Sequence, residues 1–194
     1  MSVATQQFEG VFDADVNHSS FEAGTRHMGV GSFRTRFEDV QARLTGQDGA
    51  LRLEGRTKVE SISIRNPPEF REHVVNGADF FDAANFPEIA FSSSDISLHG
   101  DGLLELTGEL TIRGVTRELT VTGTYREPQD DPYGGSRAAF DLRATIDRRD
   151  FGLNWQAQLP KGGNVLEWDV EIAVQLEFVR EVTTPADSAA SANH

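Results

Sequence analysis

Two histidines near the start of the chain, in the stretch "NHSSFEAGTRHM", are the first residues whose types could do chemistry. His18 and His27, with Asp13 and Asp15 close by, could bind a metal ion or act as an acid–base pair. The apolar residues here alternate as in a β-strand, and the histidines are nine positions apart, so they project to opposite faces. We therefore predict that they share no metal ion. His27 should face inward beside Phe21, either as a buried histidine with a hydrogen-bond partner or as a polar contact for a ligand.

Other patterns that could carry a reaction are weak. Asp79 and Asp82 would be neighbours on a helix and could form a carboxylate pair, but Asp79 is more simply explained as a helix N-cap. The chain contains no cysteine, which excludes disulfides, thiolate metal sites and a cysteine nucleophile. It also lacks the GxSxG, GxGxxG, P-loop and HExxH motifs. We predict no catalytic residue, no cofactor and no bound metal.

The composition limits the partners. The chain has 194 residues and a formal net charge of −13, which would repel nucleic acid and an anionic membrane surface. No apolar run approaches the roughly 20 residues that span a bilayer. The opening "MSVATQQFEG" lacks the pattern of a signal peptide, so we expect a cytoplasmic protein.

Apolar residues alternate with polar ones along most of the chain, as in strands with one apolar face. Such strands begin near Phe8, Ser19, Val30, Leu51, Ile89, Leu103, Val115, Ala138 and Val165, and the first two could be one bent strand. Many strands with a single apolar side must close up, which predicts an all-β antiparallel barrel of about eight strands.

The segment 66–86 interrupts the alternation. Pro67 and Pro68 suit the start of a helix and Gly77 its end, so we expect one or two short helices there. We divide the chain into a flexible N-terminus (1–7), one barrel domain (8–181) and a disordered tail (182–194), because the tail is small and polar.

The chain has 13 phenylalanines, many of them on inward faces. They could fill a packed core or line an apolar ligand cavity, and the pattern does not separate the two. The connection 152–164 holds Trp155 between glycines, and it could be a flap over a cavity mouth or a fixed plug. The residues predicted to line the interior and contact a ligand are Phe21, His27, Phe33, Phe37, Phe91, Phe140, Trp155 and Trp168.

Four ordered blocks resemble the YceI-like family of lipocalin-like polyisoprenoid-binding proteins. They are "DADVNHSSFEAGTRHM", "REHVVNGADFFDAANFPEIAF", "GELTIRGVTRELTV" and "IDRRDFGLNW", and the resemblance covers about residues 8–179. It implies an eight-stranded antiparallel lipocalin-like barrel with an elongated apolar cavity, and a homodimer in several members. It also implies a long-chain amphiphile as ligand, such as a polyprenyl chain, an isoprenoid quinone or a fatty-acid-like molecule.

We therefore predict a protein that sequesters or carries a long-chain amphiphile. Burial of an apolar chain contributes roughly 0.8 kcal/mol per CH₂, offset by ordering costs. The alternatives are an enzyme acting on a similar ligand, with His27 or an inward carboxylate as base, and a filled barrel that acts as a stress or interaction protein.

Overall fold

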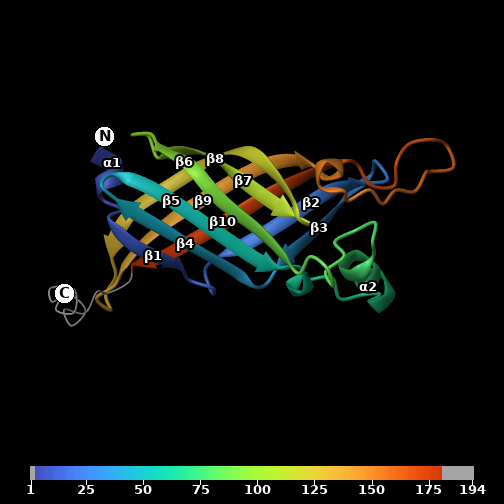
Figure 1. The fold of residues 1–194 in the computed structure, drawn as a ribbon, viewed down its shortest axis with the longest axis horizontal. Helices are drawn as coiled ribbons and strands as arrows, with labels where there is room; N and C mark the ends of the chain where they lie inside the picture. Colours follow the sequence, from blue (N-terminus) through green and yellow to red (C-terminus); the bar gives the residue numbers. More distant parts are fainter. Residues whose placement is uncertain (1–2, 181–194) are drawn as a thin grey trace, which may run out of the picture.

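The computed structural model describes residues 3–180, which form an antiparallel barrel. Eight strands make the closed ring, in the order β1-β4-β5-β6-β7-β8-β9-β10, and β10 pairs back onto β1. Figure 1 shows the barrel lying lengthwise, with its strands strongly tilted. The predicted all-β barrel of eight strands is confirmed. No helix within residues 3–180 is long and apolar enough to cross a membrane.

The helices and strands have the following bounds. The helices are α1 (Val3–Gln6) and α2 (Pro68–Asn76), with short 3-10 turns at Val59–Ser61 and Arg148–Phe151. The strands are β1 (Gly10–Ala14), β2 (Ser20–His27), β3 (Gly31–Phe37), β4 (Val40–Gln47), β5 (Ala50–Lys58), β6 (Glu88–Leu98), β7 (Leu103–Ile112), β8 (Val115–Asp130), β9 (Ser136–Asp147) and β10 (Asp169–Arg180).

β1 and β2 behave as one bent strand, as the alternation allowed. β1 pairs with the end of β10, at Ala14↔Phe178, and β2 pairs with its earlier part, at Phe21↔Val174. β3 and β4 form a second bent strand, because β4 pairs with β1 and β5 while β3 pairs with β2. The β2–β3 hairpin therefore extends the barrel wall beyond the ring, and its outer edge pairs with the segment after β5 through a short bridge at Phe37↔Ile62.

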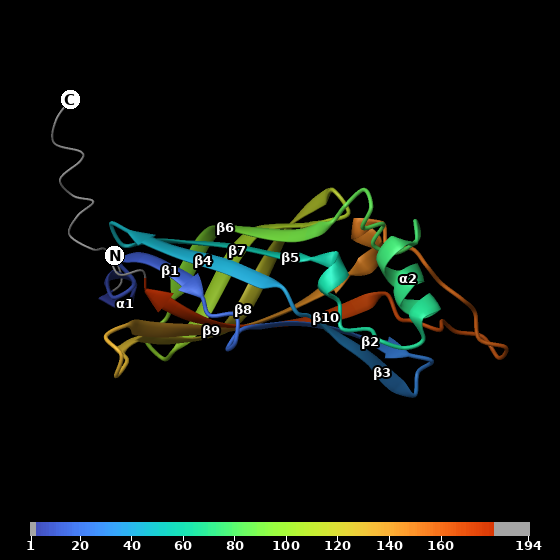
Figure 2. The same cartoon turned by 90° about the horizontal axis from the view of Figure 1, so that it is seen from below.

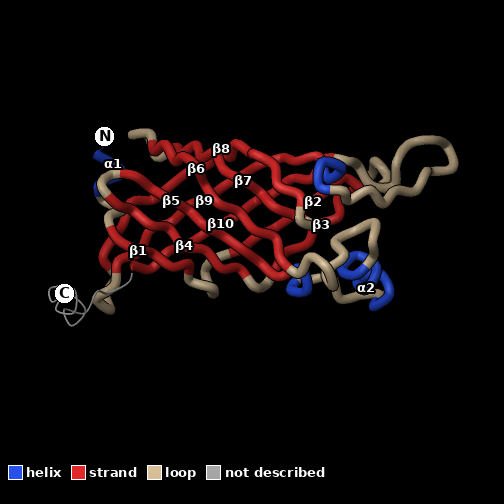
Figure 3. Tube along the Cα trace, viewed as in Figure 1, coloured by secondary structure: helices blue, strands red, loops and turns tan. Residues whose placement is uncertain are grey.

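The two ends of the barrel are covered differently. Figure 2 shows α1 at one end, and α2 with the connection 152–168 at the other, beside the flaring β2–β3 hairpin. In Figure 3 the helices and loops of this second end, in blue and tan, extend beyond the red strands of the wall. α2 begins after Pro67 and ends at Gly77, as predicted, and Val74 and Val75 are its buried residues.

The end that carries α1 is filled, and we call it the packed end. Phe8, Phe12 and Phe178 are completely buried and Phe140 is 1% exposed. Phe140 packs edge-on against Phe178, with 5.5 Å between ring centroids, and lies 5.8 Å from Phe8. The phenylalanines of this end therefore form a close-packed aromatic core.

Several details differ from expectation. β4 was not anticipated, because Ala42 and Gly46 on its inward face give a weak apolar signal. The apolar parity shifts between Phe91 and Ile96 because β6 has a bulge at Ser93/Asp95, where Ser93 Oγ accepts a hydrogen bond from the Leu53 N–H at 2.8 Å.

The chain ends were expected to be flexible. Val3–Gln6 form a short helix, and Thr5 is buried, so this part of segment 1–7 is structured. The tail 182–194 lies outside the described residues.

Candidate functional site

Two apolar cavities follow one another inside the barrel. A small cavity of about 110 Å³ lies at mid-barrel, between strands β4–β10 and Phe21. A large cavity of about 440 Å³ lies at the end covered by α2, which we call the hollow end. Phe21, Ile89 and Ile172 line both cavities, so the two adjoin. The large cavity has the size typical of a small-molecule site.

The wall of the large cavity is built largely by the β2–β3 hairpin and the helix that faces it. Phe21 stacks on Phe37, with ring centroids 4.9 Å apart. Phe33 packs edge-on against Phe70 of α2 at 5.7 Å, and Phe37 against Phe81 at 6.0 Å. The aromatic contacts thus join the hairpin to α2 across the open edge of β3.

Two segments lie over the mouth of this cavity and cover part of it. We call α2 with the turn through Ala83, together with Gly152–Trp155, the mouth cover. Trp155 stacks on Phe80 with ring centroids 5.4 Å apart, and its backbone N–H donates to the Asp79 carbonyl at 3.0 Å. The Asp79 carboxylate lies 2.9 Å from His73 Nε2 rather than capping a helix as predicted. These contacts fasten the two segments to each other.

Arg113, in the turn between β7 and β8, fixes the mouth cover to the barrel. Its guanidinium donates to the carbonyl of Gly152 and, at 2.9 Å, to that of Ala78. One side chain therefore holds both segments. Beyond Trp155, residues 156–165 form their own hydrogen-bonded loop, with Leu159 N–H donating to the Gly163 carbonyl at 2.9 Å.

Arg148 is the charged residue in the wall of the large cavity. It is 4% exposed, and it follows β9 directly. Its Nε donates to the Glu167 carbonyl at 3.1 Å and its Nη1 to the Leu153 carbonyl at 2.6 Å. Nη2 is buried without a hydrogen-bond partner among the described residues. Burial lowers the pKa of Arg148 from its ordinary value, because a low-dielectric environment disfavours the cation.

Most residues predicted to line the interior do so. Five of the eight lie in the wall of the large cavity: Phe21, His27, Phe33, Phe37 and Trp155. Phe91 lines the small cavity, and Phe140 points inward into the packed core, away from both cavities. His27 is partly exposed, and its ring has no hydrogen-bond partner among the described residues. It is therefore not the buried, hydrogen-bonded histidine that was one of the two sequence-based alternatives.

The inward placement of Trp168 is wrong. Its ring lies beneath two guanidinium groups, 4.3 Å from that of Arg148 and 4.9 Å from that of Arg149, in a polar surface hollow. The β9–β10 ladder begins only at Asp169↔Asp147, so the alternation was extended past the end of the strand. Arg148 and Leu166 line the cavity wall where Trp168 was predicted to lie.

Sequence reasoning missed some wall residues. Phe70 and Val74 come from α2, whose placement no strand pattern predicts. Arg148 did leave a signal, because it continues the inward series of Leu142, Ala144 and Ile146 along β9. A cation in the inward phase of a barrel strand marks a candidate ligand contact.

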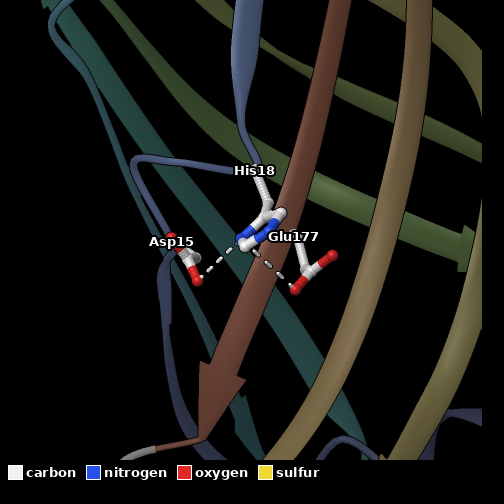
Figure 4. A group of neighbouring side chains, drawn as sticks. All are labelled: Asp15, His18 and Glu177. Carbon is white, nitrogen blue, oxygen red and sulfur yellow. Dashed lines mark hydrogen bonds and ion pairs between the residues drawn. The ribbon is translucent and has the colours of Figure 1, made fainter.

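The other histidine of the opening stretch lines neither apolar cavity. His18 Nδ1 is 3.0 Å from Asp15 and 3.9 Å from Glu177, and these three are the described side chains grouped closely enough to hold a metal ion (Figure 4). Arg137 Nη1, however, donates to the same Asp15 and Glu177 oxygens. Its positive charge opposes a second cation there, so we interpret the group as an ion-pair cluster.

This cluster favours the charged forms of Asp15 and Arg137. Hydrogen bonds from Arg137 and His18 hold the pKa of Asp15 far below its usual 3.8. Hydrogen bonds to Asp15 first, and then to Glu177 and Asp131, raise the pKa of Arg137. The cluster joins the segment after β1 to β9 and β10, at the point where the barrel ring closes.

Comparison with known proteins agrees with this architecture. The family profile of the YceI-like domain matches residues 12–178. A UPF0312 protein of Pseudomonas putida (strain W619) is 27% identical over 172 residues, covering 87% of this chain and 85% of its own. A UPF0312 protein of Pseudomonas syringae pv. tomato is 28% identical over 146 residues, with 74% and 75% covered.

Solved structures share the fold. BcnA of Burkholderia cenocepacia aligns with a TM-score of 0.68 at 24% identity, covering 84% of this chain and 98% of its own. A polyisoprenoid-binding domain of Saccharophagus degradans, implicated in plant cell wall breakdown, aligns with a TM-score of 0.65 at 11% identity, with 88% and 98% covered. The profile match spans most of the chain, and the barrel with its capped cavity fits it. The chain belongs to the YceI-like family.

Proposed function

We propose that the protein binds one long-chain amphiphile and sequesters or carries it, with the apolar chain in the large cavity and extending toward the small one. The observation that carries this proposal is the apolar cavity of about 440 Å³ beneath the mouth cover. The polyisoprenoid-binding description of the Saccharophagus degradans neighbour supports the ligand class. We propose six of the predicted residues as ligand contacts, namely Phe21, His27, Phe33, Phe37, Phe91 and Trp155.

The physical basis is burial of hydrocarbon. Each CH₂ moved from water into such a wall contributes about 0.8 kcal/mol, so a chain of many carbons binds firmly with few polar contacts. The rings of Phe21, Phe33 and Phe37 already lie in the cavity wall, which keeps the ordering cost low. An enzyme acting on the ligand would need a base beside it. His27 lines the cavity, but no carboxylate among the described residues does, so we favour binding.

Mass spectrometry of solvent extracts from the purified protein tests the proposal directly. We expect one long-chain amphiphile per barrel, or, if the protein is purified empty, a rise in unfolding temperature on adding geranylgeraniol or hexadecanoate. Empty extracts together with an unchanged unfolding temperature would contradict it.

A cavity-filling pair of variants locates the site. Ala23 packs with the core of the hollow end, so Ala23→Phe should fill part of the cavity and weaken geranylgeraniol binding at least about tenfold. Ala173→Phe is the control, because Ala173 lines a polar surface hollow and neither apolar cavity. Equal losses in both variants would place the ligand elsewhere.

Two sequence-based predictions stay with this proposal. We propose that the protein resides in the cytoplasm and that it forms a homodimer. Cell fractionation and sedimentation of the purified protein test them.

A further inference from the structure

The large cavity has an unusual charge for this protein. The chain carries 31 acidic residues against 18 lysines and arginines. Yet, within residues 3–180, no aspartate or glutamate lines either apolar cavity. The titratable side chains in the wall of the large cavity are Arg148 and His27. The interior of this acidic protein is thus neutral to positive where a ligand would lie.

Arg148 has a hydrogen-bond donor to spare. Two of its nitrogens are used by the carbonyls of Glu167 and Leu153, which hold the guanidinium in one place. Nη2 is buried, and no atom of residues 3–180 accepts a hydrogen bond from it. Leaving a charged donor unsatisfied costs free energy, and an anionic oxygen is the partner that restores most of it.

Arg148 forms no ion pair with a carboxylate of residues 3–180, so the nearby charge of Asp147 offsets its own only in part. The closest acidic residue in sequence, Asp147, accepts hydrogen bonds from the Arg149 backbone and guanidinium. The acceptors of Arg148 are neutral carbonyls, and its guanidinium rests on the Trp168 ring. A buried arginine stays protonated, so it presents a net positive charge to the cavity.

We infer that Arg148 is an anion-recognition residue and that the ligand is an acidic amphiphile, whose carboxylate or phosphate pairs with Arg148 while its chain occupies the cavity. This inference rests on the proposed binding function. Nη2 is covered in this structure, so the inference requires that the side chains over it move aside when the head group binds. The ring of His27, which also lies in the wall and has no hydrogen-bond partner within the described part of the chain, is a second donor or acceptor for the head group.

Three probes that share one alkyl chain separate the contribution of the head group to binding from that of the alkyl chain. Binding of dodecanoate, dodecyl phosphate and dodecan-1-ol is measured by calorimetry at about pH 8. The wild-type protein should bind at least one of the two anions at least about tenfold more tightly than the alcohol. A preference for dodecanoate alone indicates a fatty-acid-like ligand, and one for dodecyl phosphate alone a lipid-phosphate-like ligand. Equal binding of all three would overturn the inference and leave the binding function intact, whereas no binding by any of them would count against the binding function itself.

Matched variants assign the preference to one residue. Arg148→Met should bring the three affinities within about twofold while keeping that for dodecan-1-ol. Arg149→Met is the control, because Arg149 is exposed, lies over the same Trp168 ring and does not line the cavity. If Arg148→Met keeps the anion preference, the inference is wrong. Should that variant not fold, Arg148→Gln decides: its amide can still donate to a neighbouring carbonyl but carries no charge, so an unchanged anion-to-alcohol ratio would equally overturn the assignment.

Discussion

The same strands build two different interiors. At the packed end, the strands close into a full ring, and the rings of Phe8, Phe12 and Phe178 inside it are completely buried. At the hollow end, the β2–β3 hairpin leaves the ring, and the gap is bridged by the mouth cover. Aromatic side chains that contact a neighbour on one face only leave a cavity beside the other face. One barrel can therefore have a packed core at one end and a cavity at the other, and the packed core offsets the stability that is lost through the cavity.

Removing one aromatic ring from each end should reveal the largest difference in stability between the two ends. Phe140→Ala, at the packed end, removes a ring that is 1% exposed and should cost about 3–5 kcal/mol of unfolding free energy. Phe33→Ala, in the cavity wall, removes a half-buried ring that already faces empty space and should cost about 1 kcal/mol. Urea unfolding of both variants measures the difference. Equal costs would mean that the hollow end is as closely packed as the other.

Two strand glycines sharpen the comparison. A Cβ on Gly46, in β4, would lie 2.0 Å from the backbone oxygen of Phe8, so Gly46→Ala should cost up to about 3 kcal/mol. A Cβ on Gly24, in β2, would meet nothing closer than 3.4 Å, so Gly24→Ala should stay within about 0.5 kcal/mol of wild type. Thermal unfolding at matched concentrations compares them. A tolerated Gly46→Ala would show that the packed end can relax.

The mouth cover gives a kinetic prediction. Trp155→Ala removes the stack on Phe80 but leaves the packed end untouched, so the fold should persist while a bound fatty acid leaves at least about tenfold faster. Stopped-flow release of a fluorescent fatty acid measures the rate, with Trp168→Phe as the control because Trp168 lies outside the cavity. Unchanged release would make Trp155 a bystander, and loss of the fold would make it a fixed plug.

The smallest expected effect concerns the ion-pair cluster at the ring closure. Because the pKa of Asp15 is lower in the folded protein than its usual 3.8, the ionised carboxylate stabilises the fold. That contribution is complete above the usual value, shrinks as the pH falls below it and is lost once the depressed pKa is passed. Asp15→Asn should therefore lower stability at pH 7 and flatten its decline below about pH 4. An identical acid profile for both proteins would contradict this role.

The two ends also differ in how far the sequence predicts them. Strand alternation identified Phe21, Phe33 and Phe37 as inward, because residues two apart share a face wherever a ladder is continuous. It could not distinguish the ring of Phe140, which fills a core, from that of Phe33, which borders a cavity. That difference depends on the break between β3 and β4 and on where α2 packs, and both are set by tertiary contacts.

Alternation also fails where a ladder ends. Trp168 has the inward parity of β10 but precedes its first paired residue, and its ring lies under arginines outside. Arg148 likewise follows the last residue of β9, but there the inward parity holds. Hydrogen bonds to Glu167 and Leu153 decide its position, and these partners are not readable from strand periodicity.

The central claim is that an apolar chain occupies the hollow end, and quenching by a brominated fatty acid tests it most directly. Two single-tryptophan proteins are compared, Trp168→Phe, which keeps Trp155 in the cavity wall, and Trp155→Phe, which keeps Trp168 outside it. On titration with mid-chain dibromo-octadecanoate, we predict saturable quenching of Trp155 that is several-fold stronger than that of Trp168. Equal quenching of both, or none at all, would contradict a ligand chain in the large cavity.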